Sequence, residues 1–352
     1  MTQRAIVVAV DSRVERRAVE AELDEFEALA RAAGAQILER IVQRRDRIDP
    51  ATLVGSGKAR EIASRAHELR ADLLLVLNDL RPRQRNNLEK IVPLPIVDRT
   101  MLILDVFARH ARSREGKLQV ELAQLRYRQS NLIGAGADLS RLGGGIGTRG
   151  PGETKLEIDR RRIAARIAVL RRLIAGVRRQ RSVRRSSPRG EPLVALVGYT
   201  NVGKTSLLNA LTRSNALVAD QPFATLDPTI RRAYLAPGAY VRVADTVGFI
   251  TDLPEDLINA FRATLEELEG ADLLLHVLDA SNPQWPRQRR AVDAILRELH
   301  LDGTRRLMVF NKSDRLVSDA AGQADALYVS ARTGAGLPEL RAALTNLAES
   351  RR

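Results

Sequence analysis

The sequence contains no cysteine, only four histidines and few aromatic residues, which make up 3% of its 352 positions. Without cysteine it cannot form disulfides, bind zinc through thiolates or use a thiol nucleophile, and its histidines are too scattered for a metal cluster. The scarcity of aromatic side chains disfavours nucleic-acid recognition by base stacking. No run of eighteen apolar residues occurs, and the N-terminus lacks a signal-peptide pattern. We therefore expect a soluble, cytoplasmic protein without stable membrane insertion.

Positive charge is abundant, with a net charge of +14 and an isoelectric point near 10.8. The charge is concentrated at positions 160–189, which hold twelve arginines and no acidic residue, whereas the charged positions of 253–272 are mostly acidic. Such a balance predicts a polyanionic partner, either RNA contacted through its phosphates or an anionic membrane surface.

Residues 198–205 read G-Y-T-N-V-G-K-T, a full match to the phosphate-loop pattern G-x-x-x-x-G-K-[ST]. The apolar run 193–197 before it predicts a buried strand, and 206–211 after it opens a helix. In that context the backbone N–H groups face an anion, Lys204 reaches the β and γ phosphates, and the Thr205 hydroxyl can ligate Mg²⁺. The expected nucleotide contacts of this loop are Gly198, Tyr199, Thr200, Asn201, Val202, Gly203, Lys204, Thr205 and Ser206.

A second motif, D-x-x-G, follows the predicted strand 241–245 and consists of Asp245, Thr246, Val247 and Gly248. Asp245 is placed to hold a water on Mg²⁺, and the Gly248 N–H can meet the γ-phosphate. Between the two motifs lies the loop 223–229, in which Thr225 is the candidate for a second Mg²⁺-ligating hydroxyl and Thr229 is the alternative.

The third motif, N-K-x-D, predicts guanine specificity. The Asp314 carboxylate can accept both N1–H and N2–H of guanine, a donor pair that adenine lacks. Downstream, the Ala331 N–H can reach guanine O6. The residues expected around the base are Asn311, Lys312, Ser313, Asp314, Ser330, Ala331 and Arg332. We assign no role to His276 in the predicted strand 273–279, where a hydrogen-bonded core histidine is expected.

The candidates for catalysis are Lys204, Thr225, Gly248 and Asn201. Many regulatory GTPases carry a glutamine directly after the D-x-x-G glycine to orient water, but Phe249 stands here and can neither donate nor accept. We therefore expect slow intrinsic hydrolysis. Asn201 suggests a bound K⁺ near the bridging phosphates as a compensating charge. The alternative is that Asn201 only stiffens the loop through a backbone hydrogen bond.

The N-terminal region, residues 1–105, alternates predicted strands and helices and is expected to form a small parallel α/β subdomain. Within it Gly55, Ser56, Gly57 and Lys58 imitate a phosphate loop, but Thr52 and Ala59 stand where the full motif needs glycine and a hydroxyl. A helix N-terminal turn, contact with RNA phosphates and a second nucleotide site remain the alternatives.

Residues 106–186 are expected to form an antiparallel helical hairpin. The pattern predicts one helix over 100–131 and a second that begins near Thr154, where Thr154 and Glu157 match a capping box. Their glycine-rich connection, 134–152, carries Arg141, Arg149 and Lys155, which we expect to contact RNA; a floppy linker is the alternative. Residues 187–192 then form a linker, and 193–352 form a Rossmann-like P-loop GTPase domain.

The chain resembles the HflX family of GTPases. The resemblance rests on residues 53–58, 97–100 and 114–125, on the glycine-rich run 143–155 and on the GTPase motifs. It implies a cytoplasmic, Mg²⁺-dependent GTPase that binds GTP and GDP and acts on the large ribosomal subunit in rescue or biogenesis, with the N-terminal arm meeting ribosomal RNA. It also implies a switch I segment of Phe223, Ala224, Thr225, Leu226 and Asp227, with Thr225 on Mg²⁺. We expect a monomer.

The alternative function is a regulatory GTPase that docks at the periphery of an anionic membrane. The predicted helix at 160–189 argues against it, because its apolar stripe lacks the Trp and Phe anchors of an interfacial helix.

Overall fold

The computed structural model describes residues 2–12, 16–142, 151–185, 191–212, 214, 222–223, 229–251, 253, 270–316 and 325–350. At 16–18, 133–142, 151–156, 178 and 180–185 it describes the backbone alone. The chain divides into two compact units. The N-terminal unit comprises residues 1–109 and 118–176, and the C-terminal unit comprises 110–117 and 177–352.

The N-terminal unit contains a sheet of parallel strands in the order β2-β1-β3-β4. Its strands are β1 (Gln3–Asp11), β2 (Ala35–Arg44), β3 (Leu73–Val76) and β4 (Ile96–Asp98). The central strands, β1 over positions 5–10 and β3 throughout, are apolar and buried because helices cover both of their faces. The predicted small parallel sheet is confirmed.

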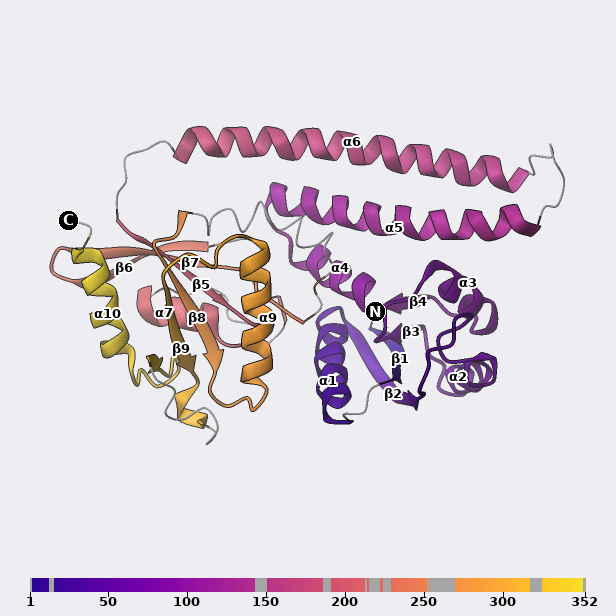
Figure 1. Ribbon diagram of the computed structural model, residues 1–352, viewed down its shortest axis with the longest axis horizontal. Helices are drawn as coiled ribbons and strands as arrows, with labels where there is room; N and C mark the ends of the chain where they lie inside the picture. Colours follow the sequence, from indigo (N-terminus) through magenta and orange to yellow (C-terminus); the bar gives the residue numbers. More distant parts are fainter. Residues whose placement is uncertain are drawn as a thin grey trace. The chain divides into compact units, whose positions relative to one another are not determined.

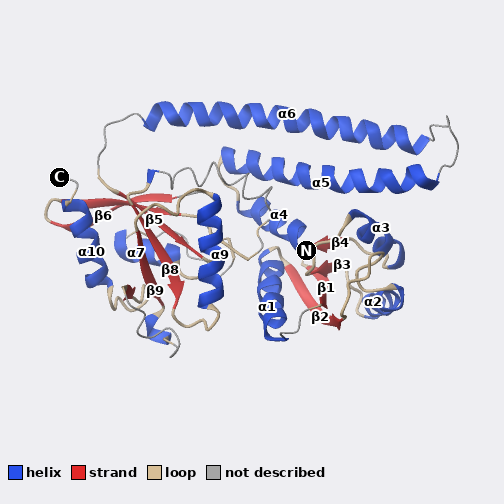
Figure 2. Ribbon diagram, viewed as in Figure 1, coloured by secondary structure: helices blue, strands red, loops and turns tan. Residues whose placement is uncertain are grey.

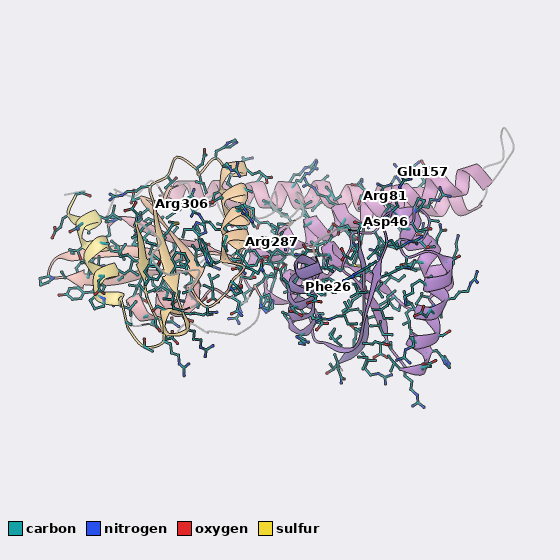
Figure 3. All side chains as sticks on the ribbon, turned by 60° about the horizontal axis from the view of Figure 1, so that its bottom comes forward. Phe26, Asp46, Arg81, Glu157, Arg287 and Arg306 are labelled. Carbon is teal, nitrogen blue, oxygen red and sulfur yellow. The ribbon has the colours of Figure 1, made fainter. Side chains whose placement is uncertain are left out.

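Four helices of this unit are α1 (Arg16–Ala32), α2 (Ser56–Glu68), α3 (Pro82–Ile91) and α4 (Arg99–His110). Figure 1 shows α1 on one face of the sheet and α2 with α3 on the other. Phe26 of α1, labelled in Figure 3, is fully buried. On the opposite face Ile62 and Leu88 of α2 and α3 pack with Ile6 and Leu74 of the sheet.

The helical region departs from the predicted single helix over 100–131. The structure has two helices there, α4 and α5 (Arg114–Leu142). Ser113 lies between them, and its hydroxyl oxygen accepts the Gly116 N–H at 2.9 Å. Ser113 thus caps a new helix, since it satisfies a first-turn donor that has no intrahelical partner. Residues 108–117 hold no large apolar side chain, so the sequence carried a signal for this break that the prediction did not use.

Helix α6 (Pro151–Arg185) begins before the predicted start at Thr154. The capping box is therefore wrong: Thr154 and Glu157 both lie inside the helix, and Glu157 pairs with Arg161 one turn on. Proline is well suited to the first turn because its missing N–H has no helical partner there. Both helices also extend into the predicted connection 134–152, and residues 143–150 lie outside the described part of the chain.

Helices α5 and α6 form the predicted antiparallel hairpin (Figure 2). Its core consists of Leu122 from α5 with Ile167, Leu170 and Ile174 from α6. At the edge of this core the Arg166 Nε lies 2.7 Å from Glu121 Oε1. The apolar stripe of α6 is thus buried within the hairpin.

A buried polar cluster joins α5 to the sheet. The Asp98 carboxylate, 1% exposed, is 2.5 Å from Arg85 Nη2 and accepts the Tyr127 hydroxyl. It also accepts the Met101 N–H at 3.0 Å, which caps α4. Burial, followed by the Asp98 charge, raises the pKa of Tyr127. The phenol therefore remains a donor to Asp98, and the cluster fixes the root of the hairpin.

The C-terminal unit contains a second sheet, ordered β10-β9-β8-β5-β7-β6 and parallel except for β6, which pairs antiparallel with β7. Its strands are β5 (Leu193–Gly198), β6 (Thr229–Ala236), β7 (Ala239–Asp245), β8 (Leu273–Asp279), β9 (Arg306–Asn311) and β10 (Ala326–Tyr328). Because β5, β7, β8 and β9 run in one direction, their carboxyl ends meet at one edge, where ligands bind in open α/β sheets. The α/β fold predicted for this half is confirmed.

Apart from parts of α4, α5 and α6, the α-helices described in this unit are α7 (Lys204–Thr212), α9 (Trp285–Glu298) and α10 (Leu337–Glu349). Helices α7 and α10 lie on one face of the sheet and α9 lies on the other (Figure 2). Trp285 of α9 meets Phe310 edge-on with centroids 5.1 Å apart, and Phe310 stacks on Tyr328. These contacts hold β9 and β10 beneath α9.

His276 of β8 is buried as predicted, but it is not hydrogen-bonded as expected. Its side chain is 0% exposed, and neither ring nitrogen has a hydrogen-bond partner among the described residues. The nearest carboxylate oxygen, on Asp293, is 3.9 Å from Nδ1 and is held by Arg306. Burial lowers the pKa of His276 to about 4, and the Asp293 charge only partly opposes it.

This histidine predicts a pH dependence of stability. The unfolded chain takes up the proton near the ordinary pKa of about 6.5, whereas the folded chain does so only near 4. Stability should therefore fall as the pH drops from about 6.5 towards 4. His276→Leu should remove this component, because it deletes the titrating group without breaking a hydrogen bond.

The measurement is the free energy of unfolding between pH 7 and pH 4.5 for the parent and for His276→Leu. His300→Asn is the matched control, since it removes an exposed histidine of the same unit. Parallel profiles for the parent and His276→Leu would contradict the prediction.

Candidate functional site

The phosphate-loop motif forms the turn between β5 and α7. Asn201 and Gly203 have positive φ angles of 59° and 90°. These angles bend the chain sharply between the end of β5 and the first turn of α7. A Cβ on Gly203 would lie 2.3 Å from Asn311 Nδ2. Glycine is therefore required there both by conformation and by the close approach of a second loop. Ser206 follows in the first turn of α7.

Lys204 begins α7 and lies across the loop. Its ammonium donates to the carbonyl oxygens of Tyr199 at 2.7 Å and Gly198 at 3.2 Å. Burial lowers the pKa of Lys204 to about 8, and the charge of Asp245 acts in the opposite direction. A buried cation held by the loop's own carbonyls at a helix N-terminus is suited to binding phosphate oxygens.

Thr205 and Asp245 meet where α7 starts and β7 ends. The Thr205 hydroxyl donates to Asp245 Oδ2 at 2.6 Å, so two of the predicted metal-site residues are in contact. A hydroxyl and a carboxylate are the hard oxygen ligands that Mg²⁺ prefers, and the pair therefore fits that ion. Thr225, predicted as a further ligand, lies outside the described residues, as do Ala224, Leu226 and Asp227. Phe223 beside them is buried.

The D-x-x-G segment continues from β7 along the phosphate loop. The Thr246 hydroxyl donates to Leu196 O at 2.7 Å, and Val247 is 2% exposed, so both residues anchor the segment in the core. Gly248 comes next to the loop: a Cβ on it would lie 2.9 Å from the Thr200 Cα and 3.1 Å from Lys204 Nζ. Only glycine fits this position without displacing the phosphate loop.

The predicted base-binding residues gather from three loops. Asn311 donates to Val202 O at 2.9 Å and accepts the Ala331 N–H at 3.0 Å. It therefore ties the phosphate loop to the loop that follows β10. The Ala331 N–H, which was expected to reach guanine O6, is instead donated to Asn311 in the structure.

Lys312 adds a second tie to the phosphate loop. Its ammonium donates to Asn201 O at 2.9 Å and lies 2.6 Å from the Asp279 carboxylate. Asp279, at the end of β8, was not predicted as a site residue, although the sequence places it at a carboxyl end next to the motif strand. Its signal is its position alone, since no motif marks it.

Asp314 accepts the Ser330 hydroxyl at 2.7 Å on Oδ1. That hydrogen bond is the main cause that lowers the pKa of the Asp314 carboxyl group, with Arg315 and Arg332 adding to it. The group is thus held as a carboxylate, the form that accepts two donors from one base edge. Ser313, Ser330, Ala331 and Arg332 surround it in the turns after β9 and β10.

The N-terminal imitation of a phosphate loop has a simpler local structure. Gly55, with φ of 83°, is the N-cap of α2, and Lys58 Nζ lies 2.6 Å from Glu61 Oε1 within that helix. This geometry favours the helix N-terminal turn among the alternatives. Among the described residues there is no cluster of three or more His, Asp or Glu side chains that could hold a metal, and no helix is long and apolar enough to cross a membrane.

Comparison with known proteins identifies the chain's relatives. Family models match residues 20–108 as "GTP-binding GTPase N-terminal", 110–187 as "GTP-binding GTPase Middle Region" and 193–312 as "50S ribosome-binding GTPase". GTPase HflX of Caldanaerobacter subterraneus is 46% identical over 97% of this chain and 80% of its own length. GTPase HflX of Escherichia coli is 44% identical over 92% of this chain and 78% of its own.

Solved structures share the fold. The crystal structure of SsGBP in complex with GDP has a TM-score of 0.54 and 23% identity, covering 99% of each chain. A GTP-binding protein of Sulfolobus solfataricus, also with GDP, has a TM-score of 0.50 and 22% identity and covers 99% of this chain and 100% of its own.

The geometry around Asp314 generates a prediction on base choice. Asp314→Asn should weaken guanosine nucleotides about tenfold or more, because hydrogen bonds to a charged acceptor contribute about 1.5–3 kcal/mol. The same variant should gain xanthosine nucleotides, since an amide can donate to the extra carbonyl of xanthine. Fluorescence titration with GDP and XDP measures both effects. Asp302→Asn, at an exposed turn, is the control; loss of GDP binding without a gain for XDP would argue against the assigned base pocket.

Proposed function

The chain belongs to the HflX family of GTPases, and from that premise we propose that it binds the large ribosomal subunit and acts there in ribosome rescue or biogenesis. It is a GTP-hydrolysing enzyme with a P-loop GTPase fold. The observation that carries the ribosomal proposal is the combination of this GTPase with a long arginine-rich hairpin in a chain of net charge +14. Its place of action would be the cytoplasm, and we propose that it works as a monomer.

Mg²⁺ is the proposed cofactor. Thr205 would ligate it directly, Thr225 would provide a second hydroxyl, and Asp245 would hold it through a water. The contact between Thr205 and Asp245 supports this assignment because it places the required oxygens together. When bound, the ion neutralises charge on the phosphates. Lys204 and the N-terminus of α7 would bind the same phosphates from the protein side.

GTP is proposed to be read at both ends. Asp314 would recognise guanine, and the Gly248 N–H would meet the γ-phosphate. The ties from Asn311 and Lys312 to the phosphate loop support a joint site, since they hold the base-binding loop and the phosphate loop in one arrangement. The presence of the γ-phosphate would then set the affinity for the ribosome.

The hairpin is the proposed contact with ribosomal RNA. Helix α6 has 35 residues, which gives a rod roughly 50 Å long at the helical rise. Its outer surface exposes Arg160, Arg171 and Arg172, and phosphates would attract these charges. Arg141, Arg149 and Lys155 near the tip, whose side chains lie outside the described part, are proposed to enter the RNA.

The rival function at an anionic membrane has less support. The apolar stripe that a helix would insert into a bilayer surface is already packed against α5, through Ile167, Leu170 and Ile174. The opposite surface of α6 carries exposed Ile158, Val169 and Leu173 among its arginines, without an aromatic anchor. The same charges would therefore serve RNA better than lipid.

The first test is ribosome binding as a function of salt. Replacing Arg141, Arg149 and Lys155 with Gln should flatten the salt dependence of large-subunit binding, by about one unit of slope for each lost phosphate contact. Affinity for GTP in isolation should stay unchanged. Cosedimentation with large subunits at several KCl concentrations gives the slope.

The control for this test removes three exposed arginines from the C-terminal unit, Arg290, Arg297 and Arg305. It loses the same charge and should keep the parent's slope. An unaltered slope in the hairpin variant would contradict the proposal. Flotation of the parent with anionic liposomes, without binding to ribosomes, would favour the membrane function instead.

The second test concerns the rate of hydrolysis. Phe249 is 1% exposed and cannot orient water, so intrinsic hydrolysis should be slow, about 10⁻⁴ to 10⁻² s⁻¹. If Asn201 helps to hold K⁺, single-turnover hydrolysis should be faster in KCl than in NaCl at equal ionic strength, and Asn201→Ser should lose that difference. Phe249→Gln should not restore the rate, since a side chain at this position points into the core.

These rates are measured with and without large subunits. Equal rates of the parent in both salts would contradict the K⁺ hypothesis and would favour the alternative that Asn201 only stiffens the loop. The main-chain carbonyl oxygen of Asn201 already accepts a hydrogen bond from Lys312 Nζ.

A further inference from the structure

The residues that follow Gly248 pair with the phosphate loop as a short parallel ladder. Tyr199 and Phe249 form an isolated bridge. The Phe249 N–H donates to Gly198 O at 3.1 Å, and the Thr200 N–H donates to Phe249 O at 2.8 Å. The N–H and the C=O of Phe249 are thus both hydrogen-bonded to the loop that would hold the phosphates.

One side chain extends this ladder by a residue. The Tyr199 hydroxyl accepts the Thr251 N–H at 2.9 Å and shares a hydrogen bond with Thr251 Oγ1 at 2.8 Å. Tyr199 is 3% exposed, whereas Thr251 is half-buried. A buried phenol therefore holds the far end of the segment through both a backbone and a side-chain group of one residue.

This pairing presses Gly248 onto the phosphate loop. A Cβ on Gly248 would come within 2.9 Å of Thr200 and 3.1 Å of Lys204 Nζ, and that ammonium itself donates to the carbonyl oxygens of Gly198 and Tyr199. A γ-phosphate bound by both Lys204 and the Gly248 N–H needs a hydrogen bond of about 2.8 Å on each side of the phosphate group. The ladder therefore competes with the γ-phosphate for the same space.

We propose that Tyr199 is a positioning residue whose hydroxyl, through Thr251, latches residues 248–251 onto the phosphate loop, and that the γ-phosphate of GTP must open this latch. The inference rests on the proposed function, in which Gly248 meets the γ-phosphate. GDP has no γ-phosphate and does not reach Gly248. The latch therefore lowers the affinity for GTP relative to GDP, and it leaves the contacts to the base and to the β-phosphate unchanged.

The test deletes one oxygen atom. Tyr199→Phe keeps the buried ring and removes the hydroxyl, and the freed Thr251 groups can turn to water because that residue is only half-buried. The variant should bind the non-hydrolysable GTP analogue GMPPNP about threefold to tenfold more tightly, since hydrogen bonds that oppose opening are lost. Its affinity for GDP should stay within about twofold of the parent, because the phosphate loop is expected to contact the phosphates through its backbone N–H groups, which this substitution retains.

A second variant separates the two hydrogen bonds. Thr251→Val removes the side-chain partner and keeps the N–H donor, so it should tighten GMPPNP by less than Tyr199→Phe. The double variant should match Tyr199→Phe alone, because both changes remove the same hydroxyl contact. Tyr240→Phe is the matched control, since it deletes the hydroxyl of a tyrosine on β7 whose ring lies tilted against Tyr234, with centroids 5.4 Å apart. It should bind both nucleotides as the parent does.

Both affinities are measured by fluorescence titration in Mg²⁺ buffer, together with thermal unfolding of each variant. Tighter GMPPNP with unchanged GDP for Tyr199→Phe supports the latch. Unchanged or weaker GMPPNP, or equal shifts for both nucleotides, overturns it, because a merely structural role would affect both. If the parent itself bound neither nucleotide, the proposed function would fail, and the latch, which rests on it, would be overturned with it.

Discussion

The side-chain amide of Asn311 is the contact on which the nucleotide site depends. It donates to the carbonyl oxygen of Val202 and accepts the Ala331 N–H, and at 2% exposure it is shielded from water. It thereby joins the phosphate loop to two base-side loops that lie more than a hundred positions further along the sequence. The requirement for glycine at 203 follows from this amide, since any side chain there would collide with it.

In the N-terminal unit a charged side chain joins separate elements in a similar way. Asp98 ends β4, caps α4 and accepts from both Arg85 and Tyr127, so one carboxylate joins the sheet, α3 and the hairpin helix α5. Burying a carboxylate is costly unless it is fully paired, and the loss of one partner leaves an uncompensated charge. A well-paired buried charge favours one orientation of the hairpin root over its alternatives. A long arm that is proposed to contact RNA needs such a root.

The parts that could be predicted from the sequence are those set by local pattern. Buried runs such as 193–197 and 273–278 are apolar apart from His276, because helices cover both faces of a parallel sheet. The helix break at 111–113 was missed although residues 108–117 hold no large apolar side chain. The helix start at 151 was missed because Thr154 and Glu157, which match a capping box, lie inside the helix. Asp279 and the pairing of Tyr199 with Thr251 could not be found, since they depend on which strand ends lie side by side in the folded sheet. For His276, burial could be predicted from the apolar residues around it in the sequence. The absence of a hydrogen bond to its ring could not, because it depends on side chains from other elements.

The position of Phe249 shows why hydrolysis by this chain should depend on a partner. Its N–H and C=O both pair with the phosphate loop, so its backbone has a fixed direction and its side chain lies in the core. A group that orients water must reach the open side of the γ-phosphate, and a residue held in this way cannot turn there without breaking the ladder. Opening the ladder frees Gly248 and changes the segment that follows it in the same step. Binding of the γ-phosphate and exposure of this segment to a partner are therefore one conformational event, and a large ribonucleoprotein that stabilised the open segment would favour GTP by the same free energy that GTP contributes to its binding.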